Sequence, residues 1–492
     1  MKKNQNEYME EKRKNPKKES VFEILRNPKT CIIFSAGFFS FLFIAMIGYV
    51  CYYINTHQVA MMNNSYNAGQ TILMTQNTRG TIYARGGEVL AESKAGTGKT
   101  DVRTYPYQNV FSHVVGYAVK GMSGIESLAN FYLLQSDIPI SEQIGNSQEN
   151  KKNPGDNVYS TLDVKLQNAA YDALGICKGA IIVTNPKTGE ILAMVSKPDF
   201  NPEDISADWK DLVADSSSSA LLNRCTQGLY PPGSTFKIIT ALEYIRENPS
   251  SYMDYQFQCK GSVTIDGTKI QCYHGIHHGK VDFTESFAKS CNSSFANIST
   301  KLNWNLFTQT SSELLFGKTL PFQMKTSISR MKTGSGMSTE DKMETGIGQG
   351  ETVVTPLHMN MITCAIANKG VLQNPYLMSK VVSHSGETIK TFSSDGQETL
   401  MTNQEAEVLR GMMKAVVNEG TASKLSGLSY TAAGKTGSAE FDDESDSHAW
   451  FTGFAPADNP QICVTVIIEG AGSGGDFAVP AAKKIFNAYF NA

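Results

Sequence analysis

Three short motifs place hydroxyl, amine and amide groups at spacings that suit acyl transfer. In chain order they are Ser234-x-x-Lys237, Ser290-x-Asn292 and Lys435-Thr436-Gly437-Ser438. A lysine three residues after a serine lies on the same face of a helix as that serine. If burial lowers the pKa of the lysine until its amine is neutral, the amine can take the proton of the hydroxyl. The first motif therefore predicts a nucleophile beside its general base.

The surroundings of Ser234 separate it from chance matches to the same pattern. Pro231-Pro232-Gly233 indicates a loop, and the apolar run that follows as far as Ile245 predicts a buried helix that starts near Ser234. The pattern also occurs at Ser286/Lys289 and at Ser329/Lys332. Most such serines cap helices and most such lysines are solvated, so only the first copy, with its apolar context, favours catalysis.

Other stretches of the chain also match the second and third motifs, but their surroundings argue against a catalytic role. Lys187-Thr188-Gly189 lies in the predicted turn of a hairpin, and Lys332-Thr333-Gly334 lies in a polar stretch with little strand tendency. Ser65-Tyr66-Asn67, a second match to the middle motif, lies close to a predicted membrane span. Lys435-Thr436-Gly437 instead lies within a predicted strand, around Thr431 to Glu440, whose small residues let a ligand approach closely. An exposed strand edge can hydrogen-bond an extended peptide.

Acyl transfer assigns a role to each of these groups. Ser234 attacks a carbonyl, Lys237 takes its proton, and the backbone N–H groups of Ser234 and Ser438 are the expected oxyanion donors. Ser290 can relay the proton to the leaving group, and Lys435 keeps the electrostatic field there positive. The expected substrate-binding residues are Asn292 for an amide, Lys435, Thr436 and Ser438 for a carboxylate, and Gly437 at the strand edge that the ligand approaches. The predicted substrate is a peptide that ends in a free carboxylate.

The three motifs in this order resemble those of the penicillin-binding proteins and class A β-lactamases. Further stretches resemble the class B penicillin-binding proteins: Gly179-Ala180, 186–196, 346–350 with 354–356, 449–456, 79–85, 113–116 and 124–126. The resemblance therefore covers nearly all of the chain from Arg79 onward. It implies a peptidoglycan D,D-transpeptidase that cross-links stem peptides ending in D-Ala-D-Ala, releases D-Ala and is acylated by β-lactams. It also implies a membrane glycosyltransferase partner.

The N-terminal segment predicts a membrane anchor. Residues 1–29 are rich in lysine and arginine, Thr30 to Ile54 contains no charged residue, and the next basic residue is Arg79. About 20 apolar residues span a bilayer. Positive charge before the span and none after it places the N-terminus in the cytoplasm and the rest outside. A cleaved signal peptide is the alternative, but its apolar region would be shorter.

The patterning of the 492 residues predicts an α+β protein. The net charge of -3 gives no case for nucleic-acid binding. Strands at both ends of the larger domain, with helices between them, indicate an antiparallel sheet flanked by helices. This is the transpeptidase/β-lactamase-like fold that the resemblance implies. The expected parts are a tail (1–29), a transmembrane helix (30–54), a small extended pedestal domain (55–150) and the penicillin-binding transpeptidase domain (151–492).

The cysteines do not form a disulfide scaffold, because those outside the predicted span are odd in number. Cys259 and Cys272 flank a predicted hairpin, so one local disulfide is an open alternative. His274, His277 and His278 lie nearby, which makes a metal site conceivable, but the spacing matches no standard zinc pattern. The expectation is therefore no metal and no cofactor. Cys291, the middle residue of the second motif, is expected to be a small packed residue.

Other functions share the same chemistry. A D,D-carboxypeptidase or a β-lactamase would hydrolyse the same acyl-enzyme, and the anchor and pedestal favour the transpeptidase over both. A non-enzymatic β-lactam sensor or scaffold is a third alternative. A sensor would need a cytoplasmic signalling module, for which 29 tail residues are too few.

Overall fold

The computed structural model describes the chain apart from residues 1–27, 63–67, 96–100, 441–446 and 492. The chain divides into two units, Met1–Asn67 and Ala68–Ala492. The first unit contains helix α3 (Pro28–Met62), and its stretch Pro28–Ile54 has a mean hydropathy of 2.3. This stretch is long and apolar enough to anchor the chain in a membrane, as the sequence predicts.

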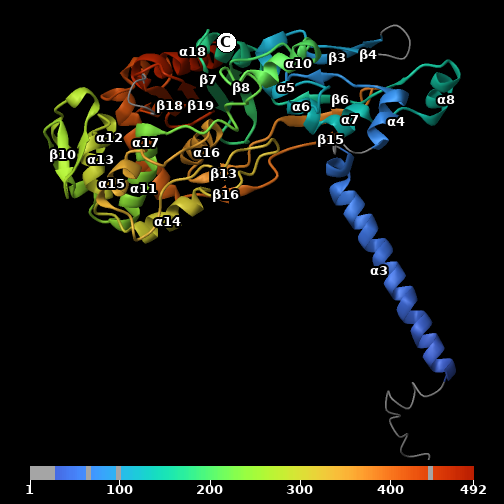
Figure 1. Cartoon of the computed structure of the whole chain (residues 1–492), viewed down its shortest axis with the longest axis horizontal. Coiled ribbons are helices and arrows are strands. Elements are labelled where there is room, and N and C mark those ends of the chain that lie inside the picture. Colours follow the sequence, from blue (N-terminus) through green and yellow to red (C-terminus); the bar gives the residue numbers. More distant parts are fainter. Residues whose placement is uncertain (1–27, 63–67, 96–100, 441–446, 492) are drawn as a thin grey trace, which may run out of the picture. The chain divides into compact units, whose positions relative to one another are not determined.

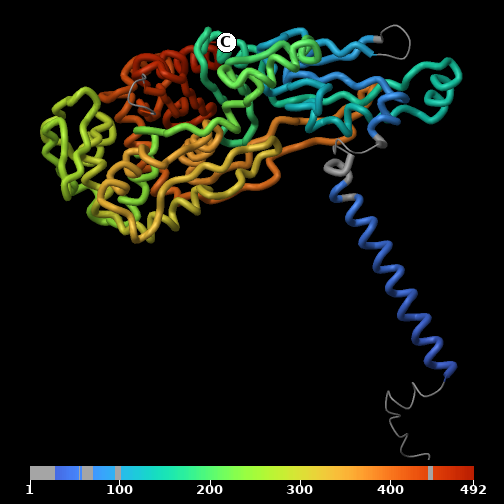
Figure 2. Tube along the Cα trace, viewed as in Figure 1, coloured from blue at the N-terminus to red at the C-terminus, as the bar shows by residue number. Residues whose placement is uncertain are grey.

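The larger part of the second unit is built on a five-stranded antiparallel sheet with the order β17-β18-β19-β7-β8. The C-terminal strands pair with the early strands, because β19 hydrogen-bonds along β7 from Cys463 opposite Thr184 to Ile468 opposite Gly179. Figure 2 shows these red and green segments side by side. The strands are β7 (Gly179–Thr184), β8 (Ile191–Lys197), β17 (Ala433–Ala439), β18 (His448–Ala455) and β19 (Ile462–Ile468). The predicted antiparallel sheet, completed from both ends of the domain, is confirmed.

Helices cover both faces of this sheet, so its central strands are apolar on both sides. Helix α16 packs on β18, β19 and β7, and Figure 1 shows α18 on the opposite side of these strands. Helix α9 packs on α18 and on β7 and β8. Trp450, Phe451 and Phe454 of β18 are fully buried between these layers. The helices here are α9 (Val164–Leu174), α10 (Ile205–Ala214), α11 (Lys237–Glu247), α12 (Phe283–Ala288), α13 (Asn292–Ser299), α14 (Trp304–Glu313), α15 (Thr339–Gly346), α16 (Pro356–Ala367), α17 (Asn403–Asn418) and α18 (Val479–Phe490).

Short elements connect these helices and strands. A small lobe contains β9 (Gln256–Cys259), β10 (Ser262–Ile265), β11 (Thr268–Gln271) and β12 (Gly279–Asp282), arranged as two antiparallel pairs. The sequence of residues 303–345 predicts irregular structure, and this is wrong at both ends of the segment, where helices α14 and α15 lie. Each of these helices begins with a capping side chain, Asn303 for α14 and Ser338 for α15. The remaining elements are η2 (Gly233–Phe236), η3 (Tyr252–Asp254), η4 (Tyr273–Gly275), η5 (Ser423–Leu425), η6 (Gly474–Ala478), β13 (Val371–Gln373) and β16 (Gln397–Thr399).

A second sheet, with the order β15-β14-β6-β2-β3-β4, links the N-terminal module to a later part of the chain. Strands β14 (Met378–Val382) and β15 (Thr388–Thr391) follow α16 in sequence, yet β14 pairs with β6. The domain boundary after residue 150 stays a prediction. The module's elements are α4 (Ala68–Gln76), β1 (Asn77–Thr78), β2 (Ile82–Tyr83), β3 (Val89–Ala95), β4 (Asp101–Thr104), η1 (Gln108–Phe111), α5 (Ser112–Val115), α6 (Gly124–Leu128), α7 (Asn130–Leu134), α8 (Ile140–Gln148), β5 (Asn153–Pro154) and β6 (Asn157–Ser160).

A buried charge network holds this module together. The carboxylate of Glu126, fully buried on α6, accepts from Arg79 Nε at 2.6 Å and from Arg103 Nε at 2.7 Å. Burial alone would raise the pKa of the Glu126 carboxyl, but the two guanidinium groups outweigh burial and hold that pKa below its usual value. The network joins α6 to the segments before β2 and in β4.

Replacing Glu126 should destabilise the second unit strongly. Glu126→Ala leaves two buried guanidinium groups without their counter-ion, and removing one partner of a buried pair costs about 3–5 kcal/mol. The free energy of unfolding can be measured by urea titration. Glu149→Ala is the matched control, because Glu149 pairs with Lys151 on the surface. If both variants unfolded at the same urea concentration, the network would not stabilise this module.

Candidate active site

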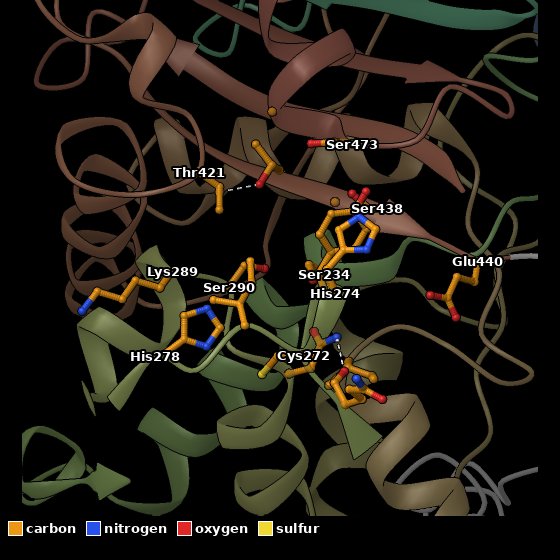
Figure 3. Close-up of a pocket in the computed structure, with 18 of the residues that line it drawn as sticks. Ser234, Cys272, His274, His278, Lys289, Ser290, Thr421, Ser438, Glu440 and Ser473 are labelled. Atoms are coloured by element: carbon orange, nitrogen blue, oxygen red, sulfur yellow. Dashed lines mark hydrogen bonds between the residues drawn. The ribbon is translucent and has the colours of Figure 1, made fainter. Parts of the chain in front are cut away.

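The predicted site residues surround one pocket of about 760 Å³. Its walls come from η2, the α12–α13 turn, strand β17, the small lobe and the segment after α17. Figure 3 labels residues from each of them, among them Ser234, Ser290, Ser438, Cys272 and Thr421. Six predicted residues line the pocket: Ser234, Ser290, Asn292, Thr436, Gly437 and Ser438. The other two, Lys237 and Lys435, are fully buried behind these walls.

Ser234 lies in the short helix η2, which continues directly into α11, so the predicted loop-to-helix start is confirmed. The preceding loop is fixed by hydrogen bonds from several sides. Trp450 Nε1 of β18 donates to Pro231 O at 3.0 Å, and Thr235 Oγ1 donates to Pro232 O at 2.7 Å. This bracing positions the Ser234 hydroxyl at the pocket wall.

A glycine-rich loop, 346–350, packs against the loop that carries Ser234. Gly233 N donates to Gly348 O at 2.9 Å. Gly348 has φ of +78°, and a Cβ there would lie 2.2 Å from Gly233 O. Only glycine allows so close an approach between the two backbones. The side-chain amide of Gln349, which lies in this loop, donates from its nitrogen to Glu440 O and accepts at its oxygen from Glu440 N. Glu440 directly follows β17.

Lys237 connects the first motif to the second. Its Nζ donates to Ser290 O and to Asn292 Oδ1, each at 2.7 Å, and lies 3.4 Å from Ser290 Oγ. Burial lowers the pKa of Lys237 to about 8. A substantial fraction of this amine is therefore neutral near physiological pH, as a general base requires. Hydrogen bonds between catalytic groups are often long until substrate binds. The bonds of Lys237 to Ser290 and Asn292 are therefore compatible with a role as general base.

Lys435 connects the third motif to the second. Its Nζ donates to Ser290 Oγ at 2.8 Å and to Thr436 O at 3.1 Å. Burial and, to a lesser extent, the positive charge of Lys237 lower the pKa of Lys435 well below its usual value. Ser290 therefore lies between two buried amines.

Ser290 occupies an uncommon backbone conformation. It has φ of +55° in the turn between α12 and α13. This left-handed turn presents the Ser290 carbonyl to Lys237 and its hydroxyl to Lys435. Strained residues of this kind persist where the surrounding structure holds them, and they cluster at functional sites. The next residue, Cys291, is the N-cap of α13, and its sulfur accepts from Ser294 N at 3.4 Å.

Strand β17 is an edge strand, as the sequence predicts, and its residues Thr436, Gly437 and Ser438 border the pocket. Thr436 Oγ1 shares a hydrogen bond with Thr421 Oγ1, drawn as a dashed line in Figure 3. Thr421 follows α17, and sequence analysis missed it, because a threonine after a helix-ending glycine carries no catalytic signature. Gln349 was also not singled out, although its glycine-rich loop was.

The competing motif copies have ordinary structural roles. Lys289 pairs with Glu285 at 3.3 Å, and Lys332 pairs with Asp341 at 2.7 Å. Lys187 lies in the β7–β8 turn and donates to Asn459. Ser65-Tyr66-Asn67 lies outside the described residues. In contrast, Ser234 and Ser290 line one pocket, and Lys435 bonds Ser290 from behind it; their catalytic roles stay a prediction.

Two regions of the chain match known protein families. Residues 179–489 match the penicillin binding protein transpeptidase domain, and residues 79–158 match the penicillin binding protein A dimerisation domain. Among curated proteins, the chain is 29% identical over 444 residues to the peptidoglycan D,D-transpeptidase PbpA of Mycolicibacterium smegmatis. That alignment covers 84% of this chain and 90% of the relative.

Solved structures have the same fold. Penicillin-binding protein A from M. tuberculosis, in a ceftriaxone acyl-enzyme complex, matches with a TM-score of 0.77 and 27% identity, over 85% of this chain and 99% of that one. The D,D-transpeptidase domain of a peptidoglycan glycosyltransferase from Eggerthella lenta matches with a TM-score of 0.75 and 29% identity, with the same shares covered. These similarities agree with the expected transpeptidase/β-lactamase-like fold.

Proposed function

The chain belongs to the penicillin-binding protein transpeptidase family, and from this premise we propose how its residues carry out D,D-transpeptidation. It is a serine-type peptidoglycan D,D-transpeptidase that β-lactams acylate, as its named relatives and acyl-enzyme neighbours indicate. The observation that carries the assignment of residues is the bonding of both buried lysines to Ser290 beside the Ser234 pocket.

Acylation uses the first two motifs. Ser234 Oγ attacks the carbonyl carbon of the D-Ala-D-Ala bond while neutral Lys237 takes the hydroxyl proton. The N–H groups of Ser234 and Ser438 hold the oxyanion of the tetrahedral intermediate. The carbon–nitrogen bond then breaks, and the proton reaches the leaving amine through Ser290. Free D-Ala departs and an ester to Ser234 remains.

Deacylation repeats these steps in reverse with a new amine. An amino group from a second stem peptide attacks the ester carbonyl and loses a proton to the same relay. The ester bond to Ser234 breaks, its oxygen regains the proton, and a new peptide bond cross-links the two strands. Water in place of the amine would give hydrolysis, which is the carboxypeptidase or β-lactamase alternative. The named D,D-transpeptidase relatives favour cross-linking over that alternative and over a non-enzymatic sensor.

The third motif recognises the end of the substrate. Lys435, in its protonated form, supplies positive charge behind the strand, and the hydroxyls of Thr436 and Ser438, which line the pocket, donate hydrogen bonds to the terminal carboxylate. Gly437 has no side chain to block the strand edge, and Asn292 binds an amide of the peptide. Thr421 joins this set through its bond to Thr436. An extended peptide can then lie along β17.

Mass spectrometry of the intact protein after exposure to penicillin tests the proposal. We expect one penicillin per chain, mapped to the peptide that contains Ser234, and an adduct that persists after free penicillin is removed. Incubation with donor and acceptor stem peptides should release D-Ala and yield a cross-linked dimer. Rapid loss of the adduct with hydrolysed penicillin would identify a β-lactamase instead.

The membrane arrangement and the partner also belong to the proposal. We place the N-terminus in the cytoplasm and the catalytic unit outside, because basic residues precede the apolar span and none follows it before Arg79. A membrane glycosyltransferase supplies the glycan strands that the transpeptidase joins. Protease accessibility of the second unit in intact cells tests the orientation.

A further inference from the structure

We propose that Cys259, Cys272, His278 and Cys291 bind a structural zinc ion beside the active site. Their ligand atoms, three Sγ and one imidazole nitrogen, lie within 4.8 Å of one another. The residues come from four places in the chain: the end of β9, the end of β11, the start of β12 and the turn before α13. Figure 3 shows Cys272 and His278 in the pocket wall near Ser290.

Three of the distances between these atoms are close to those of a tetrahedral zinc site, and all of the atoms lie within 4.8 Å of one another. Zinc–sulfur bonds of about 2.3 Å at a tetrahedral angle place two sulfurs about 3.8 Å apart, and a sulfur and a nitrogen about 3.6 Å apart. Here Cys272 Sγ lies 3.7 Å from both Cys259 Sγ and Cys291 Sγ. His278 Nδ1 lies 3.4 Å from Cys259 Sγ. Three sulfurs and one nitrogen are a ligand set that zinc favours.

The same distances exclude the disulfide alternative for this structure. A disulfide needs about 2.05 Å between its sulfurs, whereas Cys259 and Cys272 are free thiols 3.7 Å apart. Pairing any two of the three cysteines would also leave the third thiol buried beside them. All three cysteines are at most 2% exposed, so an ion would be shielded from solvent on the sulfur side.

Hydrogen bonds to the sulfurs supply the outer shell that metal-binding thiolates need. Gly261 N donates to Cys259 Sγ at 3.4 Å, and Ser294 N donates to Cys291 Sγ at 3.4 Å. Ser293 Oγ lies 3.2 Å from Cys272 Sγ. Each sulfur thus has a nearby group that can donate to a thiolate, an arrangement that a purely apolar cysteine cluster would not require.

This inference departs from the sequence-based expectation of no metal. The expectation rested on spacing along the chain, and the fourth ligand lies within the catalytic motif, where Cys291 was interpreted as a small packed residue. The structure also selects among the three histidines, because His274 and His277 are exposed while His278 is half-buried against the cysteines.

The ion would join the small lobe to the catalytic motif. Cys291 lies between Ser290 and Asn292, the two residues that bond Lys237. A bond from Cys291 to an ion held by three residues of the lobe would fix this turn and its left-handed Ser290. The metal therefore positions the proton relay without touching the substrate.

Metal analysis of the full chain in detergent tests the site independently of any activity. Protein purified without chelator should contain about one zinc per chain, as a structural site of this kind does. Exchange with Co²⁺ should produce the thiolate charge-transfer bands and intense visible bands of a tetrahedral cobalt site. Zinc content near zero after supply of Zn²⁺, or a cobalt spectrum without thiolate bands, would overturn the proposal.

Variants separate this cluster from the other cysteines. Cys272→Ser should lose bound zinc, whereas Cys177→Ser, an exposed cysteine outside the cluster, should keep it. His278→Ala is a second test variant in case Cys272→Ser does not fold. It removes only the half-buried ligand and should lower the affinity for zinc about 10–100-fold or more. Retention of zinc at wild-type affinity by both Cys272→Ser and His278→Ala would place the metal elsewhere. These measurements report zinc binding alone, so their outcome does not depend on whether Ser234 reacts with penicillin.

Discussion

Ser234→Ala should abolish covalent labelling by a fluorescent penicillin, because no other group in the proposed mechanism forms the ester. The change removes one oxygen from a short helix at the pocket wall, and alanine favours helix. The fold should therefore survive, with an unchanged melting temperature. Labelling measured by gel fluorescence, and by the mass of the intact protein, reports the loss directly.

Ser423→Ala is the matched control for that experiment. Ser423 also lines the pocket but follows Thr421 in the segment after α17 and has no part in the mechanism. It should label at the wild-type rate. Covalent labelling of Ser234→Ala at any site in the pocket would assign the nucleophile to another residue. That result would contradict the mechanism proposed for the three motifs.

The catalytic motifs could be predicted from sequence because each carries a local physical signal. The Pro-Pro-Gly loop before Ser234 and the apolar run after it determine a buried helix start, which the structure confirms. The capping box formed by Thr402 and Glu405 likewise predicts the start of α17. The strands of the five-stranded sheet were predictable because strands covered on both faces are mostly apolar, as β7, β8 and β19 are, which are buried along their whole length.

Features that depend on distant contacts could not be predicted in the same way. Helices α14 and α15 have polar faces and short lengths, so their periodicity was too weak to separate them from loops. Thr421 acquires its role only through its bond to Thr436. The cysteine cluster shows the same limit, because Cys259 and Cys291 are brought together by β9 and the α12–α13 turn rather than by any spacing motif.

Lys237→Ala should slow acylation by about 10²–10⁴-fold, the usual contribution of a general base. Lys237→Met should give a similar loss, since it keeps most of the side-chain volume and removes only the amine, so lost packing does not explain the effect. Stopped-flow measurement of adduct formation gives the rate constant. Lys289→Ala is the control, because Lys289 also lines the pocket but pairs with Glu285, and it should acylate like the wild type.

The pH dependence of acylation tests the same amine without changing the wild-type chain. Burial lowers the pKa of Lys237 to about 8, so its neutral, active form accumulates as pH rises through that value. The wild-type rate constant should therefore rise between about pH 6 and pH 8 and then level off, falling about tenfold for each pH unit below the pKa. Lys237→Met should lose this rise. A wild-type rate that does not change with pH over that range, or a Met variant that keeps the wild-type profile, would assign the proton transfer to a group other than Lys237.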